Sequence, residues 1–128
     1  MKNKTDLLYK ELSYKIVGCL FDAYNNLGGG LKEKHYQNAL LTAFKDSGIN
    51  FKSQAHFPID YKQDRVGRFY FDFLIEDKII LELKVGNRFK KQDIEQLYSY
   101  LKLAKLKLGL MANFTNDGVK CKRIVNLR

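Results

Sequence analysis

The sequence contains no tryptophan, one proline and two cysteines among its 128 residues. The cysteines, Cys19 and Cys121, have no zinc or iron–sulfur spacing, which indicates ordinary thiols of a reducing compartment. No apolar run reaches the length of a membrane-spanning helix, and no apolar segment of signal type follows residues 1–6. We therefore expect a cytoplasmic protein without membrane contact.

Composition favours a folded, basic domain. Hydrophobic residues make up 45% of the chain and aromatic residues 13%, which is enough for one core, so we expect a single domain over residues 1–128. The formal net charge is +9, and most of the excess lies in residues 65–128. A basic balance of this kind suits a polyanionic partner such as nucleic acid. A lysine-rich soluble surface is the other interpretation of the same charge.

Periodicity predicts two helices, three strands, a helix and two strands. Apolar residues recur at three- and four-residue steps in the helical segments, and alternate or run continuously in the strands. A strand, helix and strand over residues 79–114 indicate a right-handed crossover between parallel strands. The expected fold class is therefore α/β (α+β), a mixed β-sheet flanked by helices. The expected helices cover 7–27, 31–46 and 92–106, and the strands 51–61, 68–75, 79–85, 107–114 and 119–125.

In the segment 79–85, both the odd-numbered and the even-numbered positions carry apolar residues. This is typical of a central strand covered on both faces. It nevertheless carries Glu82 and Lys84, two residues apart and hence on one face of the strand. Buried charges of this kind must be paired, hydrated in a cleft or bound to a metal. The simpler interpretation is an ion pair between the two side chains at a sheet edge.

The preceding strand offers a reason for these charges. If Ile75 and Ile79 flank a three-residue hairpin loop, Asp72 lies directly opposite Glu82, with Cβ atoms roughly 4.5–5.5 Å apart. Two carboxylates this close repel each other, and a divalent cation removes the repulsion. Oxygen ligands with few protein contacts suit Mg²⁺. The register therefore predicts a metal site, whereas Glu33, near the start of the second helix, is interpreted first as a carboxylate favoured by the helix dipole.

These residues resemble a known family. Asp72, nine residues and then Glu82-Leu83-Lys84 resemble the core motif of the PD-(D/E)XK nuclease superfamily, with Phe71 where the motif has proline. Gly30-x-x-Glu33-x-x-Tyr36 resembles the signature of its bacterial GxxExxY branch. The resemblance extends over most of the chain and implies a restriction-endonuclease-like αβββαβ core with an extra N-terminal helix. It also implies that Glu33 joins the site, together with Gln96 on the third helix, which would otherwise be an exposed polar residue.

The resulting hypothesis is a nuclease that uses Mg²⁺ or Mn²⁺ to hydrolyse phosphodiester bonds. Asp72, Glu82 and the Leu83 carbonyl would bind the metal, and Glu33 would hold a water or a second ion. Lys84 is assigned an electrostatic role in preference to that of a base, because the neighbouring carboxylates favour its charged form. Gln96 would position water or a phosphate oxygen.

The expected partner is nucleic acid, with DNA as the expected substrate. Six basic residues are candidates for contacts to the phosphate backbone, which position a nucleic acid without reading its sequence. Two alternatives stay open: a nucleic-acid-binding module without catalysis, and an assembly subunit whose apolar edge strands pair into a homodimer. The six basic residues are Arg88, Lys90, Lys91, Lys120, Lys122 and Arg123.

Overall fold

The computed structural model describes residues 8–127 and confirms the predicted order of elements in that range. The predicted start of the first helix at residue 7 lies outside the described residues. No helix of the described range is both long and apolar enough to span a membrane. The elements are α2 (Lys10–Leu27), α3 (Glu33–Asp46), β1 (Phe51–Tyr61), β2 (Asp64–Ile75), β3 (Ile79–Val85), α4 (Lys91–Ala104), β4 (Leu108–Phe114) and β5 (Val119–Val125).

The strands form one mixed sheet in the order β1-β2-β3-β4-β5. β3 and β4 are parallel, as the strand–helix–strand pattern predicts, and the other neighbouring pairs are antiparallel. β3 is thus the central strand, and four of its seven residues are buried. Pro58 lies in β1, an edge strand, which is where a sheet tolerates a residue without a backbone N–H.

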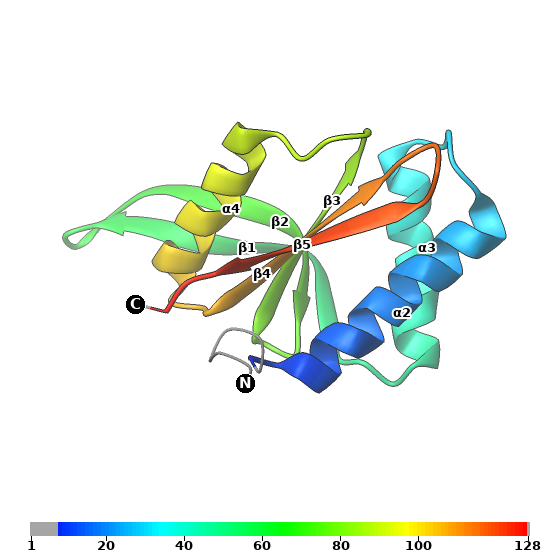
Figure 1. Ribbon diagram of the computed structural model, residues 1–128. Helices are drawn as coiled ribbons and strands as arrows, with labels where there is room; N and C mark the ends of the chain where they lie inside the picture. Colours follow the sequence, from blue (N-terminus) through cyan, green and yellow to red (C-terminus); the bar gives the residue numbers. More distant parts are fainter. Residues whose placement is uncertain (1–7, 128) are drawn as a thin grey trace, which may run out of the picture.

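Helices cover both faces of the sheet, with α2 and α3 on one side and α4 on the other (Figure 1). The larger core lies under α2 and α3, where Leu20 and Leu40 pack against strand residues such as Leu81 and Leu83. The smaller core lies under α4 and includes Leu97. Successive residues of β3 therefore point into two different cores. This explains why most of the strand has no face lined by polar residues.

One boundary differs clearly from the prediction. The second strand was expected over 68–75, with a connection over 62–67, but β2 already begins at Asp64 and only Lys62 and Gln63 connect the strands. Lys62 adopts a left-handed conformation, with φ 57°. Arg65 then donates a 2.7 Å hydrogen bond to Asp60 beside a register shift in the ladder. Polar cross-strand pairing thus extends the hairpin through a segment without apolar alternation.

The glycine run after α2 brings the chain close to the end of β4. A Cβ atom on Gly29 would lie 2.9 Å from the Thr115 carbonyl oxygen, so only glycine fits there. Tyr36 fixes the same loop from α3, since its hydroxyl donates to the Gly28 carbonyl at 2.7 Å. Its ring stacks on Phe114 with centroids 4.0 Å apart. The loop and the aromatic pair together set the position of the first turn of α3.

Candidate active site

The site lies where β2 and β3 separate. The predicted pairing of Ile75 with Ile79 is confirmed, and the ladder continues for three pairs. It ends one pair before Asp72 and Glu82, which therefore face each other across the opening. The expected opposition of the two carboxylates follows from the register, although the strands no longer pair at that point.

A kink in β2 accompanies this separation. Phe71 packs in the core under α4, whereas Phe73, two residues later, packs in the core under α2 and α3. Residues at this spacing in a regular strand point to the same face. Gln54, next to this point on β1, has a left-handed conformation with φ 49°. Asp72 thus occupies the position at which the hairpin changes faces, and its side chain reaches into the gap between β2 and β3.

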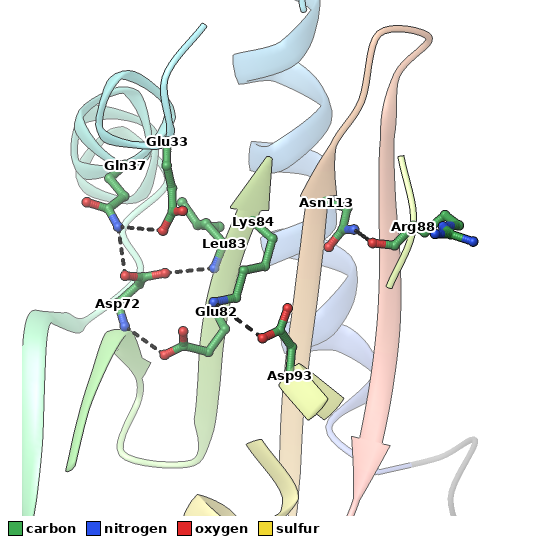
Figure 2. A network of polar contacts seen from close by, with 9 residues as sticks. All are labelled: Glu33, Gln37, Asp72, Glu82, Leu83, Lys84, Arg88, Asp93 and Asn113. Carbon is green, nitrogen blue, oxygen red and sulfur yellow. Dashed lines mark hydrogen bonds and ion pairs between the residues drawn. The ribbon is translucent and has the colours of Figure 1, made fainter. Parts of the chain in front are cut away.

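Hydrogen bonds lock Asp72 and Glu82 into the opening (Figure 2). The Leu83 backbone N–H donates to Oδ2 of Asp72 at 2.7 Å, and the Asp72 N–H donates to Oε1 of Glu82 at 3.1 Å. The N–H and C=O of one strand residue leave the strand on the same side. The Leu83 carbonyl is therefore directed toward the opening as well, and its role as a metal ligand stays a prediction.

α3 contributes two further side chains. Gln37 donates to Oδ1 of Asp72 at 2.7 Å and to Oε1 of Glu33 at 3.4 Å. Glu33 and Gln37 are four residues apart and share one face of the helix. The structure thus brings Glu33 to the carboxylate pair, as the resemblance implies. Gln37 was not predicted, and its only signal in the sequence is its position one turn after Glu33.

Burial raises the pKa values of all three acids, and repulsion from Asp72 adds to this for Glu82 and Glu33. The pKa of Glu82 rises to about 8, through burial first and the charge of Asp72 second. Burial also raises the pKa of Asp72, against the opposing effects of the Leu83 N–H and Lys84. The pKa of Glu33 is raised by burial and then by Asp72. The pocket therefore resists the full negative charge of its carboxylates unless a cation compensates it.

The chemistry of the donor set fits a hard divalent cation. Asp72, Glu82 and the Leu83 carbonyl offer oxygen atoms only, and each carboxylate oxygen retains a lone pair beyond its present hydrogen bond. In the described part of the chain, no three His, Cys, Asp or Glu side chains are grouped closely enough to hold a metal by themselves. A divalent cation can be held by so few protein ligands when it keeps several of its waters.

Lys84 lies on the same face of β3 as Glu82 and points toward α4. Its ammonium nitrogen is 3.9 Å from Oδ1 of Asp93, in the first turn of that helix. Both side chains are partly exposed, so the pair is weak and leaves the ammonium available to an anion. The charge of Lys84 also lowers the pKa values of Asp72, Glu82 and Glu33, which places it electrostatically within the site.

Gln96 is exposed on α4, and within residues 8–127 no hydrogen bond links it to the acidic residues. It follows Asp93 by three residues and so shares its side of the helix. One turn further, Tyr100 stacks on Phe69 with centroids 4.4 Å apart, as expected of a packing residue. The pKa of Tyr100 is raised by burial and then by Glu82. Of these residues, only Asp93 and Tyr100 have a described interaction with the site.

The basic residues divide between the two faces of the sheet. Arg88, Lys90 and Lys91 line a pocket beside Lys84. Lys120 and Lys122 of β5 lie against the same loop. The Lys120 ammonium donates to the Asn87 carbonyl at 3.5 Å, and the Lys122 ammonium lies 6.0 Å from the centre of the Phe89 ring.

Arg123 lies apart from this group. Its guanidinium donates to Ser13 at 2.9 Å and to the Leu8 carbonyl at 2.7 Å, at the start of α2. Adjacent residues of a strand point to opposite faces, so Arg123 could not share the face of Lys122. The structure thus gathers five of the six predicted basic residues and separates the sixth.

Comparison with known proteins identifies the class. Residues 10–124 match the model of the family PDDEXK_3, which is part of the PD-(D/E)XK nuclease superfamily. The chain therefore belongs to this superfamily. Nucleases of this superfamily generally use divalent metals. No curated protein matches the sequence.

Two solved structures share the fold. One is described as SSO0001, with a TM-score of 0.56, 19% identity and coverage of 94% of this chain; the chain spans only 59% of that protein. The other is an alkaline exonuclease (LHK-Exo) from Laribacter hongkongensis, with a TM-score of 0.50, 11% identity and coverage of 89% of this chain and 82% of that one. At these identities the likeness concerns the fold alone.

Proposed function

We propose that this protein is a metal-dependent nuclease of the GxxExxY type that hydrolyses phosphodiester bonds of DNA with Mg²⁺ or Mn²⁺. The observation that carries the proposal is the interlocked pair of Asp72 and Glu82, with Lys84 on the same face of β3. Membership of the nuclease superfamily and the alkaline exonuclease with the same fold support it.

Each side chain has a role that follows from its position. A divalent cation bound at Asp72 and Glu82 would lower the pKa of an attacking water and neutralise charge on the phosphate. The Leu83 N–H and the Gln37 amide hold the Asp72 carboxylate in a fixed orientation before substrate binds. Glu33, at the same opening, accepts a hydrogen bond from a water and orients it.

Lys84 supplies the positive charge that the carboxylates lack. Its ammonium stabilises the negative charge that develops on the phosphate oxygens during hydrolysis. The weak contact with Asp93 keeps it near the site without neutralising it. The cations of the loop after β3 hold the nucleic-acid backbone, which positions the strand without reading its bases.

The test is incubation of the purified protein with linear, nicked and single-stranded DNA, and with RNA, in Mg²⁺ or Mn²⁺. We expect cleavage of DNA that is abolished by EDTA and by Glu82→Ala, and retained by Glu11→Ala, which removes an exposed carboxylate of α2. Equal cleavage by Glu82→Ala and wild type would contradict the proposal, as would no cleavage of any substrate. Salt-sensitive binding without cleavage would select the non-catalytic binding module instead.

A further inference from the structure

The loop between β3 and α4 forms one wall of a pocket of about 680 Å³ beside Lys84. This volume lies in the usual range for pockets that hold small ligands. Four cations line the pocket, Lys84, Arg88, Lys90 and Lys91, against the single carboxylate of Asp93. The net positive charge suits a phosphate group, and Lys84 connects the pocket directly with the site of hydrolysis.

Asn113 adds an unpaired acceptor to this pocket. Its side chain is 2% exposed, and its Nδ2 donates to the Arg88 carbonyl at 2.7 Å, which fixes the orientation of the amide. Its Oδ1 is the one buried side-chain polar atom within residues 8–127 that has no hydrogen-bond partner. Asn113 pairs with Lys84 across the β3–β4 ladder, and its Oδ1 lies on the side of the amide away from Arg88 (Figure 2). A buried acceptor without a donor is unfavourable. Oδ1 is itself covered, so a ligand N–H group would satisfy it after a small shift of the pocket wall.

An aromatic surface completes the pocket. Phe89 is half-buried in its wall, and the Lys122 ammonium lies 6.0 Å from the centre of its ring. Aromatic rings of this kind stack on nucleobases with little dependence on sequence. A phosphate alone would use the cations but leave Phe89 and Oδ1 of Asn113 without a role. A nucleotide uses all three, because it joins a phosphate, a stacking ring and N–H donors.

We propose that this pocket binds one unpaired nucleotide of the substrate strand next to the bond that is cut, and that the enzyme therefore prefers single-stranded substrate. The inference rests on the proposed nuclease function. In a duplex each base is stacked on its neighbours and its donors are paired, so it cannot enter a side pocket without being flipped out. An unpaired nucleotide brings its base at a much smaller cost.

The first test measures binding by fluorescence anisotropy in EDTA, where metal-dependent cleavage cannot occur. The probes are a single-stranded DNA oligomer, the same sequence as a blunt duplex, and an oligomer of abasic nucleotides. We expect the single strand to bind at least tenfold more tightly than the other two. Equal binding of the abasic oligomer would reduce the pocket to a phosphate site and overturn the inference.

The second test uses Phe89→Leu, which removes the ring but keeps an apolar side chain. We expect about tenfold weaker binding of single-stranded DNA, unchanged binding of the duplex, and recovery in Phe89→Tyr. Phe21→Leu is the matched control, because Phe21 is exposed on α2, across the sheet. Equal losses for both substrates would overturn the inference. Unchanged binding of the duplex, together with recovery in Phe89→Tyr, shows that a selective loss of single-strand binding does not come from a folding defect.

Cleavage in Mg²⁺ separates this inference from the proposed function. If the wild type cleaves and Phe89→Leu leaves the preference between single strand and duplex unchanged, the pocket inference is wrong and the nuclease stands. If nothing is cleaved but single-strand binding depends on Phe89, the pocket stands and catalysis is wrong. If the wild type neither binds nor cleaves nucleic acid, both are wrong.

Discussion

The Gln37 side-chain amide donates a 2.7 Å hydrogen bond to Oδ1 of Asp72, although the two residues are 35 positions apart in the chain. The bond connects α3 to the opening between β2 and β3 and leaves Oδ2 of Asp72 to the Leu83 N–H. Asp72 is thus oriented from the helix and from the central strand at once. An orientation fixed before the metal and substrate arrive costs no rearrangement during the reaction.

Replacing Gln37 with alanine should weaken both metal affinity and cleavage by about 10- to 100-fold, as expected for a residue that orients a metal ligand. Gln37→Glu should also lower cleavage, because an ionised carboxylate cannot donate the hydrogen bond that orients Asp72. Titration calorimetry with Mn²⁺ measures the affinity, and initial cleavage rates measure the activity. Gln63→Ala, in the exposed turn between β1 and β2, is the control. Normal metal affinity in Gln37→Ala would contradict the orienting role.

The stability of the metal-free protein should fall as pH rises. Glu82 has a pKa of about 8 in the folded protein, above the ordinary value of 4.5 that applies to the unfolded chain. Between these pH values the folded state holds a proton that the unfolded state has released, so a rise in pH favours unfolding. We expect a loss of about 1–3 kcal/mol between pH 6 and pH 8, measured by urea unfolding in EDTA.

Two comparisons isolate the contribution of Glu82 to this pH dependence. Glu82→Gln should be more stable than the wild type at pH 8 and should show a much smaller loss, whereas Glu11→Gln should behave as the wild type. Mg²⁺ should restore the stability of the wild type at pH 8, because it binds the ionised carboxylates of the folded state. An identical pH dependence in Glu82→Gln would show that other groups cause it.

Most of the fold was predictable because local patterns determine it. The apolar run of β3 predicted a central strand, and the three-residue connection after Ile75 predicted the hairpin register that is observed. That register sufficed to bring Asp72 opposite Glu82. The residues of β2 before Arg68 were missed, since polar pairs and not apolar alternation hold them in the ladder.

The rest of the site depends on contacts between elements that no local pattern records. Gln37 and Asp93 reach the site from helices, and their partners lie on strands, 35 positions away for Gln37 and just before the helix for Asp93. Arg123 was grouped with its neighbours in the sequence, but the pleat of β5 turns it to the opposite face. Gln96 was chosen from the resemblance alone, and its role stays a prediction, as do the homodimer and the single-domain boundary.

Tyr36 should contribute to stability more than to chemistry. Its side chain is fully buried, and its hydroxyl donates to the Gly28 carbonyl and accepts the Leu31 N–H at 3.3 Å. Tyr36→Phe leaves both backbone groups without this partner, which should cost about 1–3 kcal/mol and lower the melting temperature by several degrees. Tyr14→Phe, at a position that is 80% exposed, should change little. A melting temperature for Tyr36→Phe equal to that of the wild type would show that water replaces the hydroxyl.

Lys84 should act on the reaction and not on metal binding. Its ammonium lies beside the carboxylates but belongs to no ligand set, and its one described ion pair, with Asp93, is 3.9 Å long. Lys84→Ala should therefore lower the cleavage rate by about 10²-fold or more, while Mn²⁺ affinity stays within a few-fold of the wild type. Asp93→Asn should have a smaller effect, because the ammonium remains in place.

Lys102→Ala tests whether any lysine on the α4 side of the sheet would behave as Lys84 does. Lys102 lies over the Tyr98 ring on α4, so its loss removes a positive charge of the same kind without touching the carboxylates. If Lys84 acts only by raising the overall positive charge, both variants lose cleavage together and high salt reduces the difference from the wild type. If it stabilises charge at the reacting phosphate, only Lys84→Ala loses cleavage. That loss then persists at saturating substrate, because it affects kcat and not KM.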